Sequence, residues 1–441
     1  MSLKASKIIR YLIFACIALA VIVSTSAAQT VHGRLYSSFY SWEREVFGTD
    51  SEKYIQMYNG AIVHVREIGG IKNTAFHTYM RMGNVLSGDD LELRNKLYNS
   101  YFEWNKIKNI LDFSFGRQFI WAGVGNGTLD GGKLDLSLKK YGKIGFYIGT
   151  LAPLRESWKI DSWATSHMMG AYYKTNIFDT DMQISWVRKD RKPVSYGTAG
   201  VYSGRVVTVS SLMAHLAGID LSRTFKEKLT VFMRTEATIT KNKESLIKNN
   251  FEVDRFELSG DYKVNPSFMI SGQYYYRNPR QNLNSIFSIF TQSHNQEFWM
   301  NLYYYWKSYS VFGGLAFVDY DGDGSQRYNF GISSKYFSSG INKYLGYSGD
   351  FDNYYLGCML PLGGSMLMKG NVSFGRYKLY DDAADYNNLV TSSLGITLKP
   401  RQSMSFDIEV QNLKNEISNN DFRVFGRFSY WFFKRNLPKS N

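Results

Sequence analysis

Residues 403–411 read Ser-Met-Ser-Phe-Asp-Ile-Glu-Val-Gln. Every second residue is apolar and those between are polar or charged, so an extended chain places the two kinds on opposite faces. An α-helix with this sequence would spread its charges around the whole cylinder. The alternation recurs in residues 229–240, 257–264, 268–277 and 366–374, and it predicts a chain built from β-strands.

The composition excludes several protein classes. Of 441 residues, 44% are apolar and 16% aromatic, which is far too apolar for a disordered chain. Only 7 prolines are present, so the chain is no Pro-rich linker. The mean hydropathy is −0.30, and after residue 23 no apolar run reaches the ~20 residues of a membrane-spanning helix. These features favour many strands over many helices.

The N-terminus has the pattern of a cleaved secretory signal peptide over residues 1–28. Lys4, Lys7 and Arg10 precede an uncharged apolar stretch, and small residues lead up to Ala28. An uncleaved membrane anchor is the alternative interpretation. Cleavage would remove three positive charges and lower the formal charge from +14 to +11. An exported basic protein suggests anionic solutes or lipopolysaccharide as neighbours, and it makes nucleic acid an unexpected partner.

Removal of the leader would also take away one of the two cysteines. Cys358 would then remain alone, so no intramolecular disulfide can stabilise the exported domain. The fold must be held together by other means.

Three features favour a membrane barrel over a soluble sandwich. The strands run to about 10–12 residues, long enough to cross a bilayer when tilted. The face opposite the apolar one is often charged, which a sandwich core would not accept. Aromatic residues mark the strand ends, as a membrane girdle requires: Trp104, Tyr276, Tyr304, Trp306 and Phe432.

The predicted fold is therefore all-β. It is a closed transmembrane antiparallel β-barrel of about 20–22 strands in the bacterial outer membrane. Residues 29–441 would form this single domain, with no separate plug domain.

The strand count depends on one segment. Short joins near residues 69–70, 107–109, 140–142, 179–181, 265–266, 361–364 and 399–401 suggest periplasmic turns. Long polar segments near 152–165, 190–204, 241–250, 278–295, 381–387 and 413–420 suggest external loops. Counting from the two ends places residues 319–325 on opposite sides unless residues 341–348 form a short strand. Including that strand gives about 22 strands, and omitting it gives about 20.

Alternation also predicts which charged side chains face the lumen. The predicted pore-lining residues are Arg81, Glu103, Arg234, Glu236, Arg277, Lys307, Lys335, Lys369, Asp407, Glu409, Arg423 and Arg427. Glu257 and Asp261 belong to the same set. Bases modestly outnumber acids, so we expect a weak anion preference that fades as salt screens the lumen.

Few residues suggest bound cofactors. Asp319, Asp321 and Asp323 match the first half of a calcium loop, D-x-D-x-D-G, but the twelfth position is Phe330 rather than Glu. A weak calcium site in an external loop and a plain Asp-Gly turn both fit this segment. The six histidines show no metal-ligand spacing, and no C-x-x-C-H motif would attach haem. We expect no other cofactor.

Residues 115–134 resemble a motif of alginate-export-type and related porin barrels. Phe115-Gly116-Arg117-Gln118 is followed by Gly125-Asn126-Gly127 and then by Asp130-Gly131-Gly132-Lys133-Leu134. In those barrels a strand ending in G-R-Q leads through a Gly-rich loop into a D-G-x-x-L strand. The resemblance implies a diffusion porin and names no solute. One detail departs from strict alternation, because Arg117 would share the lipid face with Phe115 unless Gly116 forms a bulge.

Three functions compete on this basis. A porin would let small hydrophilic, even anionic, solutes diffuse through a polar lumen while lipid and lipopolysaccharide surround the wall. Alternatively, the barrel would sheathe a threaded partner, such as a multihaem cytochrome of an extracellular electron conduit. An enzyme or adhesin built on the loops is the third interpretation. Since no nucleophile or paired acids stand out, we expect a porin and no enzyme.

Overall fold

The computed structural model describes residues 29–44, 52–86, 93–153, 158–192, 194–197, 206–209, 212–239, 251–278, 294–346, 349–378, 385–416 and 421–435. The predicted leader 1–28, the predicted loop 241–250, most of loop 278–295 and parts of loops 152–165, 190–204, 381–387 and 413–420 lie outside these ranges. Among the residues described, no helix has the length and apolar character needed to cross a bilayer.

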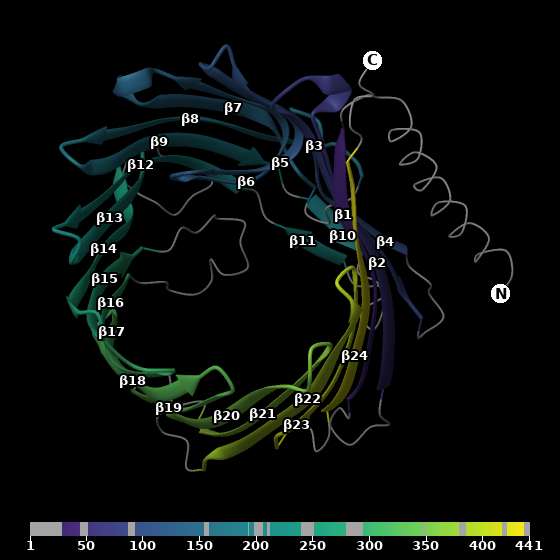
Figure 1. Cartoon of the computed structure of the whole chain (residues 1–441). Coiled ribbons are helices and arrows are strands. Elements are labelled where there is room, and N and C mark those ends of the chain that lie inside the picture. Colours follow the sequence, from purple (N-terminus) through teal and green to yellow (C-terminus); the bar gives the residue numbers. More distant parts are fainter. Residues whose placement is uncertain are drawn as a thin grey trace, which may run out of the picture.

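The wall is one 22-stranded antiparallel sheet (Figure 1). β1 pairs with β2 on one side and with β24 on the other, so the sheet closes into a barrel. Closure supplies the backbone hydrogen bonds that lipid cannot offer. The first wall strands are β1 (Thr30–Arg44), β2 (Glu52–Arg66), β3 (Thr74–Val85), β4 (Leu93–Ile107), β5 (Leu111–Ala122), β6 (Gly125–Ser137), β7 (Lys143–Leu151), β8 (Ser166–Ile177) and β9 (Thr180–Arg191).

The wall continues after a small separate sheet of β10 (Val194–Gly197) and β11 (Val206–Val209), and Figure 1 shows β11 inside the ring of wall strands. The remaining wall strands are β12 (Leu212–Phe225), β13 (Leu229–Thr238), β14 (Glu252–Asn265), β15 (Phe268–Arg277), β16 (Asn295–Trp306), β17 (Tyr309–Tyr320), β18 (Asp323–Ser334), β19 (Phe337–Gly346), β20 (Phe351–Pro361), β21 (Met366–Tyr377), β22 (Asn387–Arg401), β23 (Met404–Lys414) and β24 (Asp421–Arg435).

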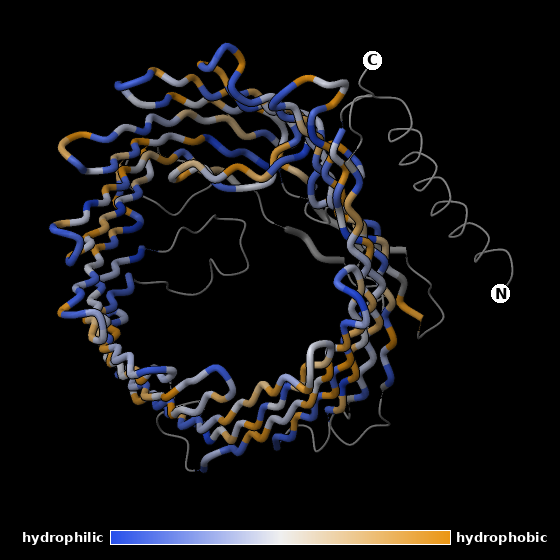
Figure 2. Tube along the Cα trace, viewed as in Figure 1, coloured by the Kyte–Doolittle hydropathy of each residue, from blue (hydrophilic) through white to orange (hydrophobic). Residues whose placement is uncertain are grey.

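The predicted alternation is confirmed along the strands. On β23, Phe406 and Ile408 are 43% and 57% exposed on the outer surface, whereas Ser405 is 3% exposed. Figure 2 shows hydrophobic and hydrophilic residues alternating along many wall strands. The outer face carries the apolar belt that a transmembrane barrel needs, including the predicted girdle residues Trp104, Tyr304 and Trp306.

The connections sort into two ends. At the end where β1 begins and β24 ends, they are short, such as 178–179, 266–267 and 307–308. At the other end, successive strand ends are separated by long stretches of sequence, residues 152–165, 192–211, 239–251 and 278–294. The segment expected near residues 341–348 is a wall strand, β19, with bounds 337–346. It places the β17–β18 turn at the long-connection end, where outer-membrane barrels have their external loops.

A row of glycines creases one sector of the wall. Gly116 on β5 is the partner of Gly131 on β6, which is the partner of Gly149 on β7. A Cβ on Gly131 would lie 2.1 Å from the Ile148 carbonyl oxygen, and one on Gly149 would lie 2.3 Å from the Asp130 carbonyl oxygen. Only glycine lets these backbones come so close, so the sheet can bend inward along this line.

Beyond the crease, the β5–β6 hairpin leaves its neighbour and folds against the inner wall. Pairing of β4 with β5 ends at Ser100 and Arg117, although β4 continues along β3. The hairpin tip reaches β9, where the Val124 amide donates to Ser185 Oγ at 3.0 Å. In Figure 1, β6 runs on the inner side of β8 and β9.

Apolar side chains from six strands hold the folded-in hairpin. This cluster is the largest buried core among the described residues, and it comprises Ile120, Ala122, Val124, Leu129, Tyr147, Leu151, Met168, Tyr172, Val187 and Leu216. An aqueous lumen wall would leave such side chains exposed, so their burial stabilises the infolded position. The opposite face of the hairpin, with Phe119 and Trp121, is exposed.

The motif around Arg117 keeps strict alternation, so the bulge at Gly116 that would turn Arg117 inward does not form. The register runs through Gly116 and Arg117 without a shift, so Gly116 forms no bulge. Arg117 stays on the side of Phe115 but is only 3% exposed. Its guanidinium donates to both Asp130 carboxylate oxygens at 2.7 Å, to the Leu97 carbonyl and to the Lys159 carbonyl of the 152–165 connection. The arginine is thus neutralised and covered rather than turned inward.

Candidate functional site

The lumen wall is the candidate site, and the structure locates every predicted pore-lining residue. Two of them are not on strands: Lys307 and Lys335 lie in the short turns 307–308 and 335–336, where strand alternation does not apply. The others lie on strands with the inward parity: Arg81, Glu103, Arg234, Glu236, Glu257, Asp261, Arg277, Lys369, Asp407, Glu409, Arg423 and Arg427.

Many inward carboxylates of the wall are paired with bases. Arg234 Nε lies 2.7 Å from Asp220 Oδ1, and an Arg255 guanidinium nitrogen lies 2.7 Å from Glu257 Oε2. Lys143 Nζ lies between Asp112 and Asp135 at 2.9 and 3.0 Å. On β24, Arg423 lies 2.5 Å from Asp421. Such pairs cancel charge locally and leave little net field in the lumen.

A different arrangement covers β24 and β1–β4, which we call the arginine–tyrosine strip. Its members are Arg34, Tyr36, Tyr58, Tyr79, Arg81, Tyr98 and Arg427. Arg81 lies 4.5 Å from the Tyr58 ring centre and 5.5 Å from that of Tyr98. Arg34 lies 5.1 Å from the Tyr36 ring and Arg427 lies 5.9 Å from it. The tyrosines support one another, since Tyr79 stacks on Tyr98 at 4.4 Å and bonds the Tyr36 hydroxyl at 3.2 Å.

The arginines of this strip have no carboxylate partner among the described residues. The buried Nε–H groups of Arg34, Arg81 and Arg427 donate to no acceptor among the described residues. Asp407 occupies the cross-strand position beside Arg427, but its carboxylate accepts from Thr397 and Ser405 at 2.7 and 3.3 Å. Guanidinium groups held against aromatic faces keep their charge and their donors for an anion.

Sequence reasoning missed Arg34, although the signal was present. Residues 34–40 alternate in the same way as the strands that were recognised, with Leu35 and Phe39 exposed outward. Sequence reasoning also missed a row of three histidines. His32, His64 and His77 come from three strands and are successive cross-strand partners. Only the register brings them together, so no sequence spacing could have indicated the row.

The predicted calcium segment forms a tight hairpin turn. Asp321 and Gly322 link β17 to β18 with φ of 54° and 94°, and the Gly322 amide donates to Asp319 Oδ1 at 3.0 Å. In the described part of the chain, no group of three or more His, Cys, Asp or Glu residues is arranged to hold a metal ion. Calcium binding by Asp319, Asp321 and Asp323 stays a prediction.

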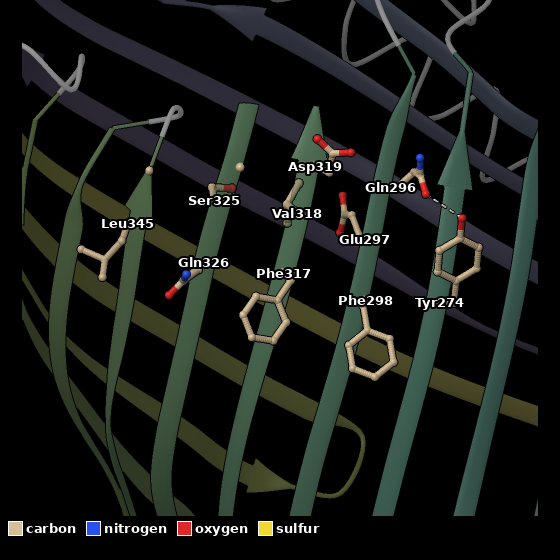
Figure 3. A pocket seen from close by; sticks show the side chains of 12 residues that line it. Tyr274, Gln296, Glu297, Phe298, Phe317, Val318, Asp319, Ser325, Gln326 and Leu345 are labelled. Atoms are coloured by element: carbon tan, nitrogen blue, oxygen red, sulfur yellow. Dashed lines mark hydrogen bonds between the residues drawn. The ribbon is translucent and has the colours of Figure 1, made fainter. Parts of the chain in front are cut away.

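A pocket of about 680 Å³ lies next to this turn at the outer ends of β15–β19 (Figure 3). Phe298 and Phe317 lie side by side on neighbouring strands, and the Tyr274 hydroxyl donates to Gln296 at 2.9 Å. These four side chains have the outward parity, whereas Glu297 and Val318 have the inward one. The pocket therefore belongs to the outer rim of the wall rather than to the arginine–tyrosine strip in the lumen.

Comparison with known proteins supports the fold. No family model matches the chain, and no curated protein matches it. Among solved structures, the siderophore receptor PirA from Acinetobacter baumannii is 10% identical, covers 92% of this chain and 81% of its own, and has a TM-score of 0.59. The P pilus usher (PapC) translocation pore is 6% identical over 91% and 99%, with a TM-score of 0.47. Acinetobacter baumannii OccAB4 is 10% identical over 93% and 99%, with a TM-score of 0.43.

The likeness to the receptor extends to the barrel fold alone. Together with the closed 22-stranded wall and its apolar outer belt, it places the chain among outer-membrane β-barrels. The protein is a barrel of the bacterial outer membrane.

Proposed function

We propose that the protein is a porin through which small hydrophilic solutes diffuse passively, with a preference for anions. The observation that carries the proposal is the arginine–tyrosine strip, where three guanidinium groups face the lumen without a carboxylate partner. A wall of 22 strands is too wide to be filled by its own side chains. Several other inward charges are paired, as in Arg234–Asp220 and Arg255–Glu257, so the strip supplies a concentrated positive charge that no carboxylate cancels locally.

The sheath for a threaded partner receives less support. A threaded cytochrome would need the lumen clear along its length. Here the β5–β6 hairpin is packed against the inner wall by a buried apolar cluster. That cluster would have to be broken to admit a broad partner, so passive diffusion of small solutes fits the molecule better.

The test is the reversal potential of the purified protein in planar bilayers under a potassium chloride gradient. We expect open channels whose reversal potential indicates a chloride preference at low salt. Exchange of Arg34, Arg81 and Arg427 for Gln, singly and together, should move the selectivity toward potassium step by step, because each exchange removes an uncompensated charge.

The matched control removes a paired charge. Arg234→Gln combined with Asp220→Asn deletes an ion pair without changing the net charge, so it should leave the reversal potential unchanged. Absence of any conductance would overturn the porin proposal. Open channels with a cation preference would retain the pore and overturn the role of the strip.

A further inference from the structure

The histidine row, defined as His32, His64 and His77, lies on the lumen side of the wall strands β1, β2 and β3. The His32 and His64 rings stack with their centres 5.0 Å apart. The Nδ1 atoms of His64 and His77 lie 2.6 Å apart. His77 Nε2 is 3.2 Å from Glu103 Oε1, and the His77 ring stacks on Tyr101 at 4.8 Å.

The geometry argues against a metal centre. A metal ion takes imidazole nitrogens at about 2.0–2.1 Å each, which holds two of them well over 3 Å apart around the ion. The 2.6 Å contact leaves no space for such an ion, and the far nitrogen of His77 lies 3.2 Å from Glu103 Oε1, away from His64. The nitrogens follow one another along the row rather than converge.

The same contact constrains the protons. Two imidazole nitrogens can approach to 2.6 Å only when one carries a hydrogen and the other offers a lone pair. If both rings are protonated, both Nδ1 atoms are donors and two positive charges face each other. The contact between His64 and His77 is therefore incompatible with full protonation of the row.

The charged groups around the histidine row include too few carboxylates to balance the positive charge of several added protons. Arg66 on β2 interacts electrostatically with His32 and His64, and Arg34 and Arg81 follow on β1 and β3. On β4, Tyr101 is neutral and Glu103 is the carboxylate that faces the row. On β24 the partner of His32 is Phe433. One carboxylate can balance one imidazolium, so further protons add net positive charge to the lumen.

We propose that the histidine row is a proton-responsive element of the lumen wall. Near neutral pH the rings share the Nδ1–Nδ1 hydrogen bond. Acidification toward pH 5 protonates the row and separates His64 from His77. It also adds positive charge next to the arginine–tyrosine strip, on the side of the end where β1 begins. The consequence for ion flow rests on the proposed porin function, whereas the proton-dependent separation of the rings does not.

The first experiment therefore needs no ion flow. The refolded protein, with isotope-labelled histidine, is titrated from pH 8 to pH 5 in detergent micelles, and the imidazole resonances are followed by NMR. We expect His64 and His77 to titrate in two separate steps and the His77→Gln variant to collapse the His64 titration to a single step. His215 has the outward parity on β12, because its neighbour Leu216 belongs to the buried inner cluster, and its ring centre lies 5.7 Å from that of Trp186, so it serves as the reference histidine. Independent single-step titration of His64 and His77 in the unaltered protein would overturn the proposal.

The second experiment measures reversal potential between pH 7.5 and 5, where most lumen carboxylates stay ionised. One added charge near a permeating ion should raise the chloride-to-potassium permeability ratio about twofold to fivefold at low salt. His64→Gln with His77→Gln should abolish most of that change, and His215→Gln should preserve it. A pH response that survives the double exchange would overturn the assignment to the row. Channels that never open would contradict the porin proposal and leave the NMR result to decide on the row.

Discussion

Arg117 is an exception to the rule that charged side chains of the wall strands face the lumen. Its side chain is on the lipid-facing side of β5, yet it is buried in a bidentate ion pair with Asp130. The side chains of the pair are 2% and 6% exposed. The sequence motif predicted a special position here, but the covering by the 152–165 connection is a tertiary contact that local sequence does not encode.

The pair yields a stability prediction. Arg117→Gln should destabilise the barrel by about 3–5 kcal/mol, because it leaves the Asp130 charge buried without its partner. Arg117→Leu combined with Asp130→Leu should recover most of this loss, since no unpaired charge remains. Urea unfolding in micelles, followed by tryptophan fluorescence, measures both. Equal losses of unfolding free energy in the single and the double variant would contradict this prediction. They would show that the two side chains stabilise the barrel by packing and not by neutralising each other's charge.

Some lumen residues could be predicted from the sequence and others could not. The structure has residues such as Arg81, Arg234 and Glu409 on strands with the inward parity that alternation predicts, because parity depends only on local spacing, and their role in lining a pore stays a prediction. Alternation does not apply at Lys307 and Lys335, which lie in turns, because a strand that ends one residue earlier turns a wall position into a turn position. It was silent on the histidine row, since register is set by the turns and by the packing of neighbouring strands.

At the scale of elements, the creased β5–β6 hairpin is the feature that distinguishes this barrel from a plain cylinder. Sequence predicted a Gly-rich segment between two strands but not its direction. The reason is physical: Gly116, Gly131 and Gly149 act together only because they are cross-strand partners. Each glycine by itself reads as an ordinary loop or bulge residue.

Gly149→Ala tests the crease. The new Cβ would lie 2.3 Å from the Asp130 carbonyl oxygen, so β6 and β7 must move apart and the hairpin must shift. Overpacking of this kind costs about 1–3 kcal/mol, and we expect a matching decrease in the urea midpoint together with larger single-channel conductance. Gly272→Ala is the matched control, because no atom lies within 4 Å of its Cβ position. Unchanged stability and conductance in Gly149→Ala would mean that the glycine row does not set the bend.

At the scale of the whole molecule, strand number and membrane orientation depend on one another. Residues 319–325 lie outside only if β19 is part of the wall, since each added strand reverses the side of the following turn. The sequence left 20 and 22 strands open because residues 337–346 alternate weakly, with Ser338, Ser339 and Gly340 near the start. Pairing of β19 with both β18 and β20 decides for 22.

Cysteine labelling tests this orientation in cells. In a Cys358→Ser background, Asp321→Cys places a thiol in the β17–β18 turn and Gly364→Cys places one in the 362–365 turn at the opposite end. A maleimide joined to a polymer too bulky for the lumen should label Asp321→Cys on intact cells. It should label Gly364→Cys only after the outer membrane is disrupted, because short turns face the periplasm. Labelling of Gly364→Cys on intact cells, with Asp321→Cys protected, would invert the barrel. Protection of both until disruption would place an even number of crossings between them and remove one strand of the segment β18–β20 from the membrane.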